Sequence, residues 1–153
     1  MSDLRELYQE LILDHGRRPR NFGPLAGATH QAIGHNPLCG DRITMHLCMD
    51  GDTVGSISFE GQGCAISQAS ASLMTEAVKG RRIPDVMSLF RKVTAMVTGR
   101  DEDVAVEGGV DLGKLAVFEG VRQYPMRVKC ATLPWHTLHN ALEGKGAEVA
   151  RTE

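Results

Sequence analysis

Three of the four cysteines stand in settings that suit a metal ligand or a reactive thiolate, and the first of them is Cys39. It lies in a segment shaped by Pro37 and Gly40, and Asp41 follows two positions after it. Glycine lets the backbone turn tightly between the two side chains. A thiolate and a carboxylate could therefore face the same ion, and zinc accepts both as ligands.

Cys64 and Cys130 stand where helices are expected to begin. Cys64 closes a Gly-Gln-Gly-Cys segment that joins a predicted strand to a predicted helix, and Cys130 follows the basic residues Arg127 and Lys129. The N-terminus of a helix carries partial positive charge, which lowers the pKa of a thiol and favours the thiolate that ligates metals. We therefore predict two further sulfur ligands.

Three thiolates and one carboxylate make a ligand set that suits tetrahedral zinc: Cys39, Asp41, Cys64 and Cys130. Taken singly, each cysteine could be a small buried hydrophobe, and Asp41 could brace its own loop. The coincidence of three cysteines at element junctions favours the metal site. Cys48 differs because it alternates within a predicted strand, and we interpret it as a structural or surface thiol.

The predicted ligand set has a net charge of about −2 with a divalent ion bound. Such a charge is costly where water is excluded, so a nearby cation is expected. Arg127 is the first candidate for this cation and Lys129 is the second. The alternative is that both are ordinary surface charges.

The composition is that of an ordinary globular protein. The 153 residues fit a single domain, 1–153, and the hydrophobic fraction of 42% is ordinary for a soluble fold. A net charge of −2 without a basic run argues against a nucleic-acid binder. No signal peptide and no membrane span are evident. We therefore expect a cytoplasmic protein whose thiols stay reduced.

Hydrophobic spacing predicts strands in the first half of the chain, after one helix. The helix starts near residue 4 and ends before residue 17. Alternating apolar residues predict strands at 42–50 and 53–60, which an Asp-Gly-Asp turn joins into a hairpin. A third strand is expected near 29–35.

The second half has the pattern of helices. They are predicted at 65–79, 84–98 and 112–121, and a last one from about Cys130 to residue 143 has Pro134 near its first turn. A mobile loop is expected at 99–109 and a flexible tail after 144. Strands followed by helices indicate an α+β fold, with a small antiparallel three-stranded sheet and helices packed on one face.

Three segments carry a resemblance to one known family. They read Asn-Pro-Leu-Cys-Gly-Asp-Arg at 36–42, Gly-Gln-Gly-Cys-Ala-Ile-Ser at 61–67 and Arg-Val-Lys-Cys-Ala-Thr-Leu at 127–133. With them, nearly the whole chain resembles the U-type iron–sulfur assembly family, which includes IscU, the N-terminal domain of NifU and SufU. The resemblance implies a SufU/IscU-like domain.

Departures from the IscU pattern favour the SufU branch. Lys129 stands where IscU proteins carry a histidine before the last cysteine, and the segment 124–129 lacks their Leu-Pro-Pro-Val-Lys chaperone-docking motif. In addition, 66 positions separate Cys64 from Cys130. This length is consistent with the insertion that SufU-like proteins carry between those cysteines, which we place within about residues 80–115.

The resemblance implies zinc held by Cys39, Asp41, Cys64 and Cys130, and a role as a sulfurtransferase. The implied partner is a SufS-type cysteine desulfurase, a pyridoxal phosphate enzyme that generates a persulfide. In SufU-like proteins a histidine of the partner replaces the first cysteine on zinc, so Cys39 is the expected sulfur acceptor. Downstream iron–sulfur assembly or acceptor proteins would follow. The chain would act with its partner rather than as a stand-alone enzyme.

Three other functions use the same residues. The chain could be a scaffold on which an iron–sulfur cluster is built at these ligands and transferred to apo-proteins. It could be a cysteine hydrolase, with Cys64 or Cys130 as the nucleophile and His136 or His139 as the base. It could also be a purely structural zinc module, in which Cys39 would be dispensable for sulfur transfer.

Overall fold

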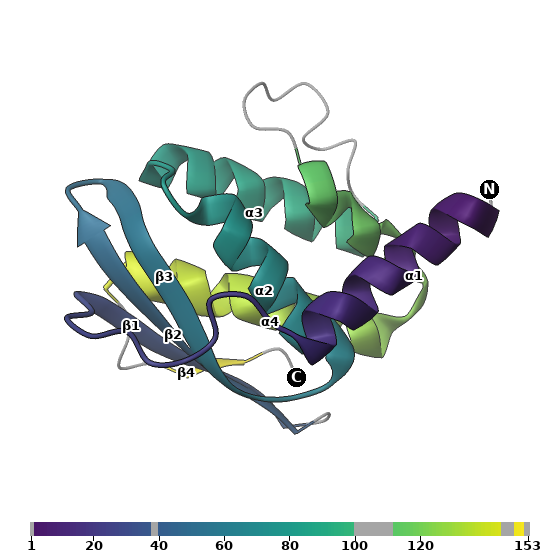
Figure 1. Cartoon of the computed structure of the whole chain (residues 1–153), viewed down its shortest axis with the longest axis horizontal. Helices are drawn as coiled ribbons and strands as arrows, with labels where there is room; N and C mark the ends of the chain where they lie inside the picture. The colour runs from purple at the N-terminus through teal and green to yellow at the C-terminus, as the bar shows by residue number, and fades with distance from the viewer. Residues whose placement is uncertain (1, 38–39, 100–111, 145–148, 152–153) are drawn as a thin grey trace.

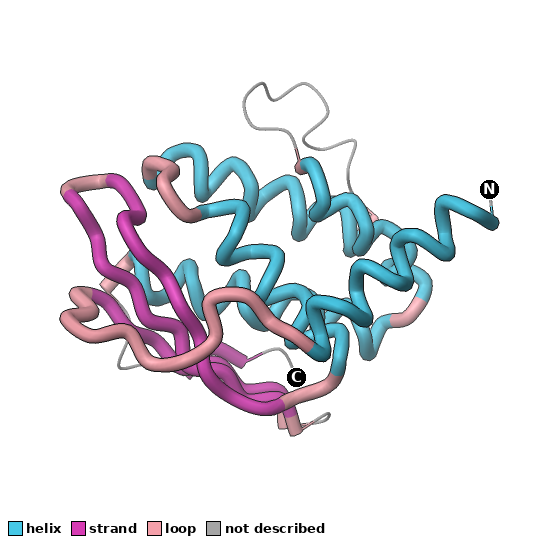
Figure 2. The backbone as a smooth tube through the Cα atoms, in the orientation of Figure 1, coloured by secondary structure: helices cyan, strands magenta, loops and turns pink. Residues whose placement is uncertain are grey.

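The computed structural model describes residues 2–37, 40–99, 112–144 and 149–151. Figure 1 shows a sheet on one side of the molecule and helices on the other, and Figure 2 shows the same layers by type of element. The helices are α1 (Ser2–Arg17), α2 (Ala65–Val78), α3 (Ile83–Thr98), the 3-10 helix η2 (Gly113–Gln123) and α4 (Pro125–Leu142). The strands are β1 (His30–Asn36), β2 (Asp41–Asp50), β3 (Thr53–Gln62) and β4 (Val149–Arg151).

The sheet has the strand order β3-β2-β1-β4. Strands β1, β2 and β3 are antiparallel neighbours, and this confirms the predicted three-stranded sheet. One face is apolar and covered by helices, because Ile43, Met45 and Leu47 of β2 are buried while Arg42 and Thr44 between them are not. This period of two places Asp41, the first residue of β2, on the same helix-covered face.

Helix α4 packs directly on β1 and β2 and places its middle turns over the sheet. The closest approach is at Gly34 of β1. A Cβ atom at this position would lie 2.0 Å from Oγ1 of Thr137, and 3.1 Å from side-chain atoms of Ile43 and Leu133. The absence of a side chain at position 34 therefore sets how deeply α4 sits on the sheet.

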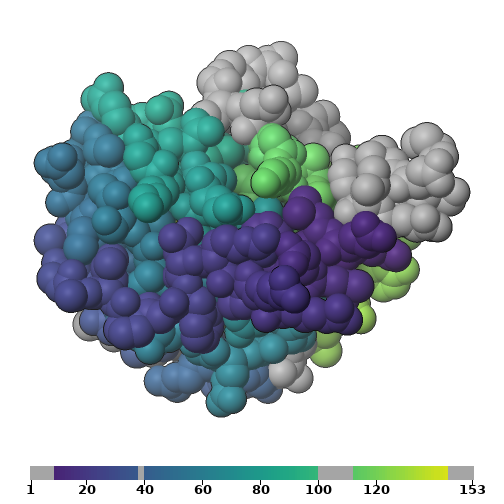
Figure 3. Space-filling model, viewed as in Figure 1, coloured from purple at the N-terminus to yellow at the C-terminus, as the bar shows by residue number. Residues whose placement is uncertain are grey.

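Helix α1 and the turn after it position the start of α2. In the middle of α2, the hydroxyl of Ser72 contacts both segments. It lies 2.7 Å from Nδ1 of the buried His15, and it accepts a hydrogen bond from the backbone amide of Arg20. At the other end of the contact, a Cβ atom on Gly16 would lie 3.2–3.3 Å from atoms of Ala65. In the space-filling view, the purple surface of α1 and its following loop crosses the molecule beside the teal surface of the α2–α3 region (Figure 3).

The start of the last helix differs from the prediction. Helix α4 begins at Pro125 rather than near Cys130, because Tyr124 is extended (φ −127°, ψ 91°) and proline suits the first helical position. Cys130 consequently lies in the second turn of α4. Pro134 lies inside the helix, where it removes the amide that would bond the carbonyl of Cys130.

Other differences from the predicted elements are smaller. The segment predicted as a short helix at 112–121 is the 3-10 helix η2, and β4, in the segment after residue 144, is a strand that we did not predict. β4 runs parallel to β1. The loop predicted at 99–109 lies outside the described residues except for Gly99, and the insertion within about 80–115 stays a prediction. Within the described ranges, no helix has both the length and the hydropathy that crossing a membrane requires.

Candidate metal centre

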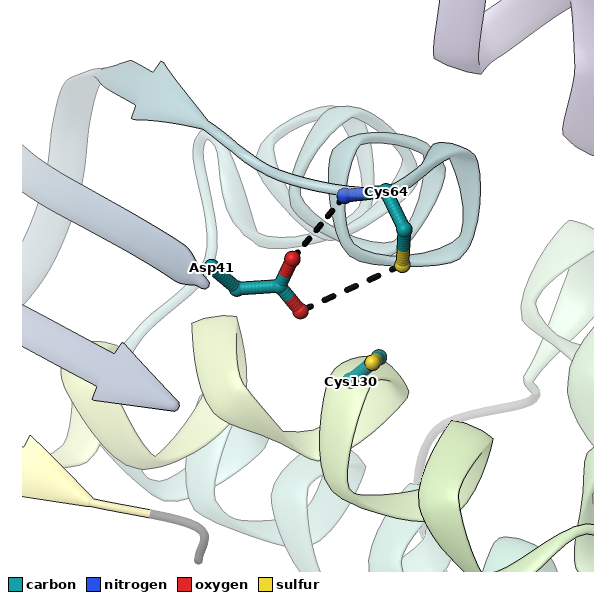
Figure 4. A group of neighbouring side chains, drawn as sticks. All are labelled: Asp41, Cys64 and Cys130. Carbon is teal, nitrogen blue, oxygen red and sulfur yellow. Dashed lines mark hydrogen bonds between the residues drawn. The ribbon is translucent and has the colours of Figure 1, made fainter. Parts of the chain in front are cut away.

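Asp41, Cys64 and Cys130 meet at one point, although 23 positions separate the first two and 66 the last two. One ligand atom of each lies within 4.8 Å of the others. They come from three different elements, namely the start of β2, the residue before α2 and the second turn of α4, and Figure 4 shows their side chains turned toward a shared space. Ligands of a tetrahedral zinc ion lie about 3.5–3.8 Å from one another. Small side-chain movements would therefore bring these three into coordination.

Asp41 is held in place by the backbone that leads into α2. Its carboxylate is completely buried, and Oδ1 accepts a hydrogen bond of 2.9 Å from the backbone amide of Cys64. Gly63 makes this approach possible, since a Cβ atom there would lie 2.6 Å from Oδ1. The glycine of the Gly-Gln-Gly-Cys segment thus leaves room for the carboxylate of a different strand.

Cys64 is the N-cap of α2, as the sequence predicts. Its Sγ accepts a hydrogen bond from the amide of Ser67 at 3.4 Å, and its thiol lies 3.9 Å from Oδ2 of Asp41. The pKa of Cys64 is lowered to about 6, chiefly because Cys130 donates a hydrogen bond to the thiolate and secondly because of the Ser67 amide; burial and the charge of Asp41 oppose this shift. Cys64 is therefore largely a thiolate at neutral pH.

We predict that Cys64 of the metal-free protein reacts with iodoacetamide at half its maximal rate near pH 6, because only the thiolate attacks. An ordinary cysteine would reach this point near about pH 8.5. The rate is measured by mass spectrometry of the peptide that contains Cys64. In Cys130→Ala the midpoint should move to higher pH, whereas Cys130→Ser keeps a hydroxyl donor and should move it less. A midpoint near pH 8.5 in the unaltered protein would contradict the prediction.

Cys130 is nearly inaccessible to solvent, with 2% of its surface exposed. The side-chain amide of Asn36, the last residue of β1, lies 4.0 Å from its Sγ, and Asn36 is itself completely buried. The prediction that Cys130 stands at a helix N-terminus is wrong, since α4 starts five residues earlier. Its position at the site is set by the packing of α4 on β1.

Cys39, the fourth predicted ligand, lies outside the described residues, and its place at the site stays a prediction. The residues on either side of its segment are described: Asn36 and Asp41 face each other across the end of the β1–β2 pair. Sequence reasoning missed Asn36 as a residue of the site. One feature of the sequence could have indicated it. Every second residue of β1 faces the core, and Asn36 is a polar residue at one of these positions.

The other candidate residues lie outside the group formed by Asp41, Cys64 and Cys130, or their role there stays a prediction. Arg127 is exposed and Lys129 half-buried on α4, just before Cys130, and their roles stay predictions. Sγ of Cys48 lies 3.4 Å from the carbonyl oxygen of Gly27, on the other face of the sheet, which fits a structural thiol.

The two histidines of the hydrolase hypothesis contact helix α3 instead of the cysteines. The ring of Phe90 lies 5.4 Å from that of His136 and 5.1 Å from that of His139, and Nε2 of His139 lies 3.0 Å from Oε1 of Glu143. Burial lowers the pKa of His136. Nothing in this arrangement supports a nucleophile–base pair with Cys64 or Cys130.

Comparison with known proteins identifies related sequences along most of the chain. The family model for the NifU-like N-terminal domain matches residues 7–131. The chain is 40% identical over 141 residues to the zinc-dependent sulfurtransferase SufU of Bacillus subtilis (strain 168), which covers 92% of each sequence. It is 36% identical over 143 residues to the iron–sulfur cluster assembly scaffold protein IscU of Streptococcus pyogenes serotype M1, covering 94% of this chain and 87% of that protein.

Solved structures agree with this likeness. A crystal structure of a proposed iron–sulfur cluster assembly scaffold protein for the SUF system, from Fervidobacterium islandicum AW-1, superposes with a TM-score of 0.79 at 37% identity. The match covers 90% of this chain and 98% of that one. The fold and the sequence thus lead to the same group of proteins.

Proposed function

The chain belongs to the family of NifU-like N-terminal domains, which serves iron–sulfur cluster assembly, and from this premise we propose that it is a zinc-dependent sulfur acceptor. Sulfur would come from the persulfide of a SufS-type cysteine desulfurase and pass to Cys39. The observation that supports this proposal most directly is the convergence of Asp41, Cys64 and Cys130. The relative from Bacillus subtilis, which is named a zinc-dependent sulfurtransferase, supports the choice of activity.

The donor set fits a zinc ion. Two sulfurs and a carboxylate oxygen, all within 4.8 Å of one another, are partly or fully withdrawn from water. Such a set of potential anions is costly to bury unless a cation joins it. Cys39 would complete the set as the fourth ligand. When bound, the ion would keep the sulfurs deprotonated at neutral pH and let one of them be exchanged for a ligand from the partner.

The transfer step would be a thiol–disulfide type of exchange at Cys39. Its thiolate would attack the terminal sulfur of the partner's persulfide, and a new S–S bond would form on Cys39. The bond between the two sulfurs of the persulfide would break, and the partner's cysteine would leave as a thiolate. Asp41, Cys64 and Cys130 would stay in place, since each has a hydrogen-bond donor within the fold. The product would be the sulfur source for downstream iron–sulfur assembly or acceptor proteins in the cytoplasm.

A desulfurase assay with radiolabelled cysteine tests this proposal. Zinc-loaded protein should acquire label on Cys39, and Cys39→Ser should lose it entirely, whereas Cys48→Ser should transfer sulfur like the unaltered protein. Metal content is measured on each variant, so that a lost acceptor is distinguished from a lost ion. Full labelling of Cys39→Ser would refute the role of Cys39 and favour a structural zinc module.

The scaffold function is the second candidate, because the relative from Streptococcus pyogenes is named a cluster assembly scaffold. The same thiolates could hold an iron–sulfur cluster. Anaerobic reconstitution with iron and sulfide, followed by transfer to an apo-ferredoxin, separates the two functions. A stable cluster with visible absorbance that is transferred intact to the apo-ferredoxin would favour the scaffold function.

A further inference from the structure

We propose that Asn36 is a positioning residue of the metal centre, whose side-chain amide orients the sulfur of Cys130 and offsets part of its negative charge. This inference rests on the proposed metal site. It concerns a residue of the Asn-Pro-Leu-Cys-Gly-Asp-Arg segment that is not itself a ligand. The argument combines the position of Asn36 in the sheet, its contact with Cys130 and the position of Cys130 in its helix.

The register of the sheet places Asn36 beside the ligands. Asn36 is the last residue of β1 and faces Asp41, the first residue of β2, across an antiparallel pair. Both residues are completely buried and belong to the helix-covered face. Side chains that face each other in this way start about 4.5–5.5 Å apart at their Cβ atoms. Asn36 is therefore next to one ligand on its own sheet and reaches toward another on α4.

The contact with Cys130 is made in a dry environment. Nδ2 of Asn36 lies 4.0 Å from Sγ of Cys130, and the cysteine exposes 2% of its surface. Once a metal ion replaces the proton that Cys130 shares with Cys64 in the metal-free protein, Cys130 is a thiolate that can only accept hydrogen bonds, and the NH₂ group of the amide is the group that suits it. Away from water, the attraction between this donor and a negative sulfur is stronger than at the surface.

Cys130 needs a side-chain donor because of its place in the helix. Cys64, at an N-cap, takes a hydrogen bond from the amide of Ser67, and Asp41 takes one from the amide of Cys64. Cys130 lies in the second turn of α4, where backbone amides are used within the helix, as those of residues 127 and 128 are by the carbonyl of Tyr124. A thiolate at this place depends on a neighbouring element for its donor, and Asn36 of β1 supplies one.

Loss of the Asn36 amide is expected to change two quantities, the affinity for zinc and the energy of the sulfur-to-metal charge-transfer band. Residues that hydrogen-bond to metal ligands typically contribute 10–100-fold to metal affinity. For Asn36→Ala we therefore expect zinc affinity, measured by competition with a chromogenic chelator, to fall about 10–100-fold. In the cobalt(II)-substituted protein, the sulfur-to-cobalt charge-transfer band should move to longer wavelength, because the sulfur loses a donor that withdraws electron density.

Two further variants make the test specific. Asn36→Leu keeps the volume of the side chain but has no donor, so it should lose about as much affinity as Asn36→Ala and show the same spectral shift. Gln31→Ala removes an exposed amide from the same strand and should match the unaltered protein in affinity and spectrum. The melting temperature of each metal-free variant separates a loss of stability from a loss at the metal.

The outcomes divide clearly. If Asn36→Ala and Asn36→Leu lower the melting temperature of the metal-free protein but leave zinc affinity and the cobalt spectrum unchanged, Asn36 has a structural role only and the proposal is wrong. The same holds if the two variants lose affinity equally without any spectral change. If the unaltered protein binds neither zinc nor cobalt, the proposed function itself fails, and this inference fails with it.

Discussion

Removing zinc with a chelator is expected to lower the melting temperature of the protein by about 8–16 °C. An ion that binds only the folded chain stabilises it by about 4 kcal/mol at a concentration 1,000 times its Kd. A chain of this size loses about 2–4 °C for each kcal/mol. The effect is large because the ion would join α2, α4 and the sheet at one point, through Cys64, Cys130 and Asp41.

Differential scanning calorimetry with and without the chelator measures this change, with the metal content checked before and after. The double variant Cys64→Ala, Cys130→Ala is the control, because it should melt at the same temperature in zinc and in chelator. An unchanged melt of the unaltered protein after verified removal of the metal would count against the site.

Gly34→Ala is expected to destabilise the protein by about 3 kcal/mol or more, the upper part of the range for overpacked cores. The new methyl group would lie 2.0 Å from Oγ1 of Thr137, so α4 would have to move away from β1. Because α4 carries Cys130, we also expect the variant to bind zinc more weakly than the unaltered protein.

Denaturant unfolding measures the loss of stability of Gly34→Ala, and two further variants serve as controls. Thr137→Ala removes the atom that clashes most, so in the presence of this change Gly34→Ala should cost less than it does alone; neighbouring sites of this kind are not additive. Gly120→Ala is the matched control, since nothing lies within 4 Å of a Cβ atom there. If Gly34→Ala were as mild as Gly120→Ala, the close packing of α4 on β1 would be disproved.

The sheet and the start of α2 could be predicted because their signals are local. Ile43, Met45 and Leu47 alternate with polar residues, and this period alone indicates a strand with one buried face. Cys64 follows two glycines and precedes a run of small residues, a pattern that places it at the start of a helix, where the structure has it.

The start of α4 differs from the prediction because the chain offers two prolines that a first turn could accept. The sequence pattern predicts Pro134 there, whereas in the structure Pro125 occupies the first turn and Pro134 lies inside the helix. An interior proline costs a helix one hydrogen bond, and the packing of Leu133, Thr137 and Leu138 in the core offsets this. Tertiary packing of this kind is not visible in a local pattern.

At the candidate site, the residue types were predictable but the supporting contacts were not. Asp41, Cys64 and Cys130 belong to segments with recognisable composition, and the structure brings them together. The donor role of Asn36 depends on the register of β1 with β2 and on where α4 crosses them. Neither can be read from the neighbours of Asn36 in the sequence.

The wide spacing of the converging residues has a consequence for biosynthesis. A ribosome that has just completed Cys64 must add another 66 residues before it reaches Cys130, which takes roughly 3–13 s at usual rates. During that interval the nascent chain holds a thiol and a carboxylate without their partner. An ion that needs all three ligands would therefore be bound only late, after translation has delivered α4 with Cys130.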